Sequence, residues 1–142
     1  GSDSPFIENK QPQIRIINLK TTFQERLIAA SNLVETPYII LLGDDEFHVP
    51  STLKKCVRFL EEHDDYSACM GTKINFTFDE KNKTTLFKLD TKDYLGHQID
   101  SSDYSNRMSL HMHKYQPTSF YAVVRTPVWK KAVSTYKVHT QS

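Results

Sequence analysis

The strongest constraint on the fold is a short apolar run at residues 38–42, Tyr-Ile-Ile-Leu-Leu, which Pro37 precedes and Gly43 interrupts. It is the most apolar stretch of the chain and contains no alternating polar residue. This pattern is typical of a strand that helices cover on both faces, as in a parallel sheet. We therefore expect residues 38–42 to form a strand buried on both sides.

The segments around this run alternate between β-type and helical patterns. Residues 14–19 are rich in β-formers, and a helix is expected to start after Thr22, whose spacing to Glu25 fits a capping box. A second helix is expected from Ser51 and a further strand at residues 68–70. Such alternation predicts an α/β layered fold, with a mostly parallel sheet flanked by helices and joined by right-handed crossovers.

The second half of the chain has a different pattern. Apolar and polar residues alternate over residues 74–78, and residues 85–89 are expected to return as the second strand of a β-hairpin. Residues 90–117 are polar and predict a loop. A strand at 120–124 and a closing helix over 127–136 complete the predicted fold, so its C-terminal half includes an antiparallel portion.

The length of 142 residues predicts one domain, residues 13–142, after a tag remnant and leader at residues 1–12. The net charge of +1 gives no overall field that would recruit nucleic acid. No apolar run reaches the roughly 18 residues that a membrane span requires, and no signal peptide is seen. We therefore expect a cytoplasmic location, with any contact to a membrane surface made by regions outside this chain.

Three acidic residues, Asp44, Asp45 and Glu46, follow the apolar run directly. In open α/β sheets, ligands bind in the crevice beyond the carboxyl ends of the strands. Carboxylate oxygens suit Mg²⁺ or Mn²⁺, which take one or two protein carboxylates and complete their shell with water and substrate phosphates. The acids therefore predict a cation and phosphate site, and the alternative is a solvated acidic turn.

Residues 36–47, Thr-Pro-Tyr-Ile-Ile-Leu-Leu-Gly-Asp-Asp-Glu-Phe, resemble the strand and acidic motif of family 2-like glycosyltransferases of the GT-A fold. Further segments resemble one bacterial branch of that family, at residues 56–71, 106–107, 115–118 and 121–126. The resemblance implies an enzyme that transfers a sugar from a nucleotide-diphosphate sugar to a hydroxyl of a carbohydrate or other acceptor. The family's opening strand, helix and strand have no counterpart before Ile14, so the domain is expected to be partial.

The resemblance also implies roles for the acids. Asp44 would lie near the donor's ribose, and Asp45 and Glu46 would hold Mn²⁺ or Mg²⁺ against the diphosphate. Glu46 stands where the usual motif ends in Asp, which lengthens the side chain by one methylene. An acceptor hydroxyl would need a carboxylate base, for which Asp100 and Asp103 are the candidates, the alternative being that both are polar loop residues.

Four basic or imidazole side chains complete the predicted site. Arg107 and Arg125 match diphosphate geometry, although Arg125 would equally cap a helix or pair with a surface acid. His111 and His113 are further candidate metal ligands, with surface positions as the alternative. Two rival functions remain: a non-catalytic carbohydrate- or protein-binding domain of the same fold, and a metal-dependent phosphotransfer or hydrolase domain.

Overall fold

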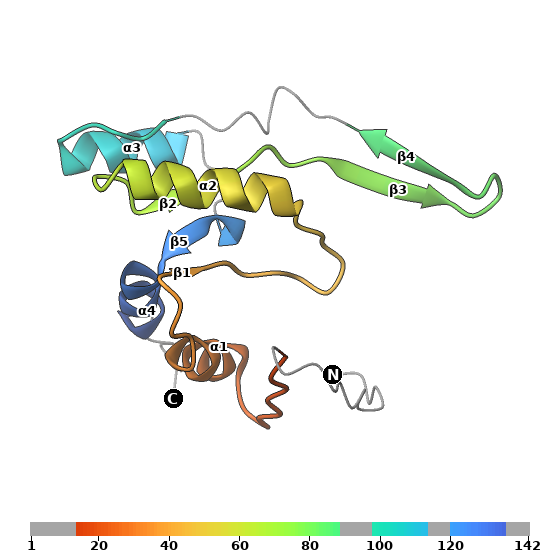
Figure 1. Ribbon diagram of the computed structural model, residues 1–142, viewed down its shortest axis with the longest axis horizontal. Helices are drawn as coiled ribbons and strands as arrows, with labels where there is room; N and C mark the ends of the chain where they lie inside the picture. Colours follow the sequence, from red (N-terminus) through yellow and green to blue (C-terminus); the bar gives the residue numbers. More distant parts are fainter. Residues whose placement is uncertain (1–13, 89–97, 114–119, 136–142) are drawn as a thin grey trace.

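The computed structural model describes residues 14–88, 98–113 and 120–135 (Figure 1). The predicted leader at residues 1–12 lies outside these ranges. In chain order the elements are α1 (Phe23–Asn32), β1 (Tyr38–Ile39), α2 (Pro50–Glu62), β2 (Ala68–Cys69), β3 (Asn75–Asp79), β4 (Thr84–Lys88), α3 (Tyr104–His113), β5 (Val123–Arg125) and α4 (Thr126–Thr135).

The central sheet has the strand order β1-β5-β2, and β5 runs antiparallel to both neighbours. Val124 lies opposite Ile39 on one side and Ala68 on the other. Strands β1 and β2 therefore point the same way, as a β-α-β crossover predicts, but they do not pair with each other. The expectation of a mostly parallel sheet is wrong for the described residues, because β5 occupies the place between the two crossover strands.

Helices cover both faces of this sheet, as Figure 1 shows with α2 on one side and α1 and α4 on the other. Tyr38 and Ile40 pack against the core of Cys56, Leu60 and Val123. The intervening Ile39 and Leu41 pack against a second core, made by Ala122, Val124 and Trp129. The predicted two-sided packing is therefore confirmed for residues 38–41, whereas Leu42 belongs to neither core.

The predicted length of that strand is wrong, because only Tyr38 and Ile39 pair with β5 and Leu42 is 53% exposed. Residues 14–19 form no strand at all, and their apolar side chains are exposed. A strand needs a neighbour for its N–H and C=O groups. No described segment pairs with residues 14–19, so their β-propensity alone does not produce a strand.

Several local signals are confirmed. The Thr22 hydroxyl accepts a hydrogen bond from the Glu25 amide at 3.3 Å, and Glu25 Oε2 accepts one from the Thr22 amide at 3.1 Å, which completes the capping box. The predicted hairpin forms from β3 and β4 and projects away from the helices (Figure 1). Its turn contains Lys83 at φ 49°, the left-handed conformation that such a tight return requires.

The polar segment expected to be a loop instead contains helix α3. Asp103 starts it, since its Oδ1 accepts a hydrogen bond from the Asn106 amide at 2.7 Å. None of the helix residues is buried. Sequence patterns reveal a helix by its stripe of apolar residues. Helix α3 has no buried face that would require such a stripe, so the pattern did not predict it.

Candidate functional site

A cleft of about 830 Å³ lies at one edge of the central sheet. Its walls come from the loop after β1, the first turns of α2, the segment after β2, part of the β3-β4 hairpin, and Tyr121 just before β5. Because β1 and β2 run in the same direction and β5 runs in the opposite one, the ends of the first two and the start of the third meet at this edge. This is the edge at which the crevice rule places a ligand.

Two of the three acids line the cleft. Asp45 and the half-buried Glu46 belong to its wall, whereas Asp44 is exposed and does not line it. Glu46 Oε2 accepts a hydrogen bond from the Gly43 amide at 3.0 Å. A Cβ atom at Gly43 would lie 2.9 Å from that oxygen and 3.3 Å from Asp45 Oδ1. Both carboxylates thus lie close to the Gly43 backbone, on the side where a Cβ atom would stand.

This convergence fits a divalent cation held by a small number of protein ligands. Two adjacent carboxylates repel each other, and a bound cation removes that cost. Among the described residues no group of three His, Cys, Asp or Glu side chains is placed to hold a metal. Asp45 and Glu46 are two carboxylates, the number of protein ligands that Mg²⁺ commonly takes when water and substrate phosphates complete its shell.

Tyr121 joins the acids from a distant part of the chain. The negative charge of Glu46 raises the pKa of Tyr121, and burial, the charge of Asp45 and a hydrogen bond to Glu46 raise it further. The sequence analysis did not include Tyr121 among the site residues. Its contact with Glu46 has no local signal, because it depends on β5 entering the sheet beside β1.

This contact gives a titration that tests the geometry. Glu46→Gln removes the main negative charge near Tyr121, so we expect the pKa of Tyr121 to fall toward the ordinary value of 10.0. Ultraviolet tyrosinate titration measures this, and the difference from a Tyr121→Phe variant assigns the signal. Because folding raises this pKa, the folded state should also lose stability as the pH rises above 10.0. An unchanged titration in Glu46→Gln would contradict the contact.

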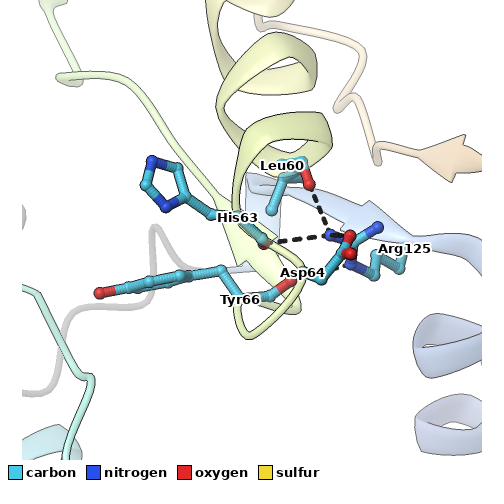
Figure 2. Close-up of polar contacts among 5 residues, drawn as sticks. All are labelled: Leu60, His63, Asp64, Tyr66 and Arg125. Atoms are coloured by element: carbon cyan, nitrogen blue, oxygen red, sulfur yellow. Dashed lines mark hydrogen bonds and ion pairs between the residues drawn. The ribbon is translucent and has the colours of Figure 1, made fainter.

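Arg125 lies away from the cleft and caps helix α2 (Figure 2). Its Nη2 donates to the carbonyl oxygens of Leu60 at 2.5 Å and His63 at 3.2 Å, and its Nε donates to the Tyr66 carbonyl at 2.9 Å. A longer ion pair reaches Asp64 at 3.6 Å. The structure thus shows the helix-capping alternative for this residue, which leaves few of its donors for a phosphate.

The remaining predicted site residues gather on and before α3, and none of them lines the cleft. Asp103 caps α3, and Arg107 Nη1 donates to the Ser101 carbonyl at 2.7 Å. Asp100 Oδ2 accepts a hydrogen bond from Gln98 at 2.9 Å. His111 and His113 lie in the last turn of α3. In Figure 1, α3 and the loop that carries the acids lie at opposite ends of α2.

Comparison with known proteins adds one finding. The family described as Glycosyl transferase family 2 matches residues 5–124. The matched region contains the acidic loop, the β1-α2-β2 crossover and Tyr121. Searches of curated proteins and of solved structures return no significant match. In the described part of the chain, no helix has the length and apolar character needed to cross a membrane.

Proposed function

The chain belongs to glycosyl transferase family 2, and we propose that it transfers a sugar from a nucleotide-diphosphate sugar to an acceptor hydroxyl with the assistance of Mn²⁺ or Mg²⁺. The observation that carries this proposal is the convergence of Asp45 and Glu46 over Gly43, inside a cleft at the sheet edge where β1 and β2 end. The family supplies the general chemistry, and the cleft supplies a place for the donor.

In this proposal Asp45 and Glu46 hold the cation, and the exposed Asp44 beside them contacts the donor's ribose. When bound, the cation would act as a Lewis acid that offsets charge on the departing nucleoside diphosphate. The Gly43 amide and Tyr121 orient the carboxylate of Glu46 through their hydrogen bonds. Because the carboxylate is already held in one orientation, the longer Glu side chain loses less conformational entropy when the cation binds.

Calorimetry of a nucleoside diphosphate, with and without Mn²⁺, tests the proposal. We expect Asp45→Asn to weaken binding about tenfold in the presence of Mn²⁺, which equals the loss of about 1.4 kcal/mol. Without Mn²⁺ the two proteins should bind equally weakly, because the carboxylate acts through the cation. Asp65→Asn is the matched control, since Asp65 is exposed and lies outside the cleft. Equal Mn²⁺-dependent binding by all three proteins would remove the role of Asp45.

A second function, a non-catalytic binding domain of the same fold, also has structural support. Glu46 stands where the usual motif ends in Asp, and its Oε2 already accepts a hydrogen bond from the Gly43 amide. Such a domain would bind carbohydrate or protein without a cation. A panel of nucleotide sugars distinguishes the two functions: release of nucleoside diphosphate with any donor supports transfer, whereas cation-independent binding without release supports the alternative.

A further inference from the structure

Two free cysteines lie together in the wall of the cleft. Cys56 belongs to α2 and is 5% exposed, and Cys69 ends β2 and is half-buried. Cys69 packs against the core cluster of Cys56, Leu60 and Val123, and both cysteines line the cleft. Helix α2 and strand β2 thus each contribute one thiol to the wall of the cleft.

The two thiols differ in accessibility, and the surroundings of Cys56 make it a weaker acid than an ordinary thiol. Burial is the main factor that raises the pKa of Cys56 to about 11, and a hydrogen bond to Cys69 and its charge add to this. Cys56 is therefore a protonated, shielded thiol at neutral pH. Cys69 is more exposed toward the cleft, so a reagent that enters the cleft meets Cys69 first.

We propose that Cys56 and Cys69 form a thiol-modification site, in which a low-molecular-weight disulfide entering the cleft oxidises the pair to an intramolecular disulfide. The Cys69 thiolate attacks one sulfur of the reagent and releases one thiol. The Cys56 sulfur, on losing its proton, then attacks Cys69 in the mixed disulfide and releases the second thiol. Two protein thiols become one disulfide, and the reagent disulfide is reduced to two thiols, which take up the two protons.

The bond would join helix α2 to strand β2, both of which contribute to the cleft wall. The redox state of the pair would thereby fix the relative position of these two elements. The proposed disulfide depends only on the contact between the two thiols. Its failure to form would therefore leave the proposed donor role of Asp45 and Glu46 unaffected.

Incubation of the whole chain with oxidised glutathione, followed by intact mass and free-thiol titration, tests the site. The expected product has lost two hydrogen atoms and both free thiols, and dithiothreitol restores them. Cys56→Ala, which cannot close the bond, should stop at a mixed disulfide with one glutathione on Cys69. Wild-type protein that stops at one glutathione, or that carries two, would overturn the proposal.

A second reagent tests the contact without oxidation. Phenylarsine oxide bridges two neighbouring thiols, so one equivalent should block both cysteines in the wild-type protein. Excess monothiol should leave this adduct intact, and a dithiol should reverse it. Cys69→Ser should lose the resistance to monothiol, because only one thiol remains. An adduct on the wild-type protein that monothiol removes as readily as from Cys69→Ser would show that the thiols do not act together.

Discussion

Arg125→Ala is expected to lower the free energy of unfolding by about 3 kcal/mol, because the guanidinium serves three backbone carbonyls at once. Hydrogen bonds from a charged donor contribute about 1.5–3 kcal/mol each in favourable cases. The Arg125 side chain is 25% exposed, so water replaces part of what is lost. Equilibrium unfolding in urea, followed by circular dichroism, measures the change.

The position of Arg125 explains why the effect should be large. The last carbonyls of a helix have no partner within the helix, and they carry partial negative charge. Helix α2 has no basic residue in its last turn to complement that charge. Arg125, from a strand far along the sequence, supplies both the hydrogen bonds and the positive charge (Figure 2). Its removal therefore affects the junction of α2 with the sheet as well as one ion pair.

Arg58→Ala is the matched control, because it also replaces arginine by alanine and lies on the surface of α2, the helix that Arg125 caps. Arg58 pairs with Glu62 at 2.7 Å, but the two side chains are 79% and 55% exposed. Exposed pairs of this spacing contribute little to stability, because water and salt screen the two charges. Asp64 is 98% exposed, so Asp64→Ala should also cost little. If Arg125→Ala costs no more than Arg58→Ala, the capping network does not stabilise the fold.

Sequence reasoning succeeds where the structural signal is local. Signals that act within a few residues were predicted: the capping box at Thr22, the start of α2 near Pro50, and the hairpin turn. Each of these depends on hydrogen bonds or backbone preferences inside one short segment. The chain can satisfy them before any tertiary contact forms, so the sequence alone contains the necessary information.

Features that need a partner from elsewhere were predicted less well. Residues 14–19 have strong β-propensity but no described neighbour, and the strand at Tyr38 extends only as far as β5 accompanies it. The direction of β5 was also missed, because nothing within Val123–Arg125 specifies which strands it will join. Sheet register and direction are set by packing on both faces, which only the folded chain defines.

The candidate site shows the same difference between local features and features that depend on distant parts of the chain. The rule that ligands bind beyond strand ends placed Asp45 and Glu46 at a cleft edge, and the structure has a cleft there. The proximity of Tyr121 to Glu46 could not be predicted, since it results from the antiparallel entry of β5. The site residues expected before and on α3 were chosen from residue type alone, and residue type does not determine which edge of a fold a side chain reaches.

A second large effect is expected at the junction of α1 and α4. Trp129 is 7% exposed, packs with Ala122 and Val124, and donates a hydrogen bond from Nε1 to Ser31 Oγ at 2.8 Å. Ser31 is 2% exposed and in turn donates to the Leu27 carbonyl at 2.6 Å. This short chain of hydrogen bonds connects the two helices inside a core that also holds the central sheet.

Trp129→Ala is expected to lower the free energy of unfolding by about 4 kcal/mol, mainly because it leaves a large cavity beside β5. Trp129→Phe keeps most of the ring volume and should cost less, and Ser31→Ala, which leaves the indole N–H buried without an acceptor, should cost about 1–2 kcal/mol. Urea unfolding followed by circular dichroism compares the three variants. A larger loss in Trp129→Ala than in Trp129→Phe or Ser31→Ala would show that the volume of the ring contributes more to the free energy of unfolding than its hydrogen bond. Equal losses in Trp129→Ala and Trp129→Phe would show the reverse.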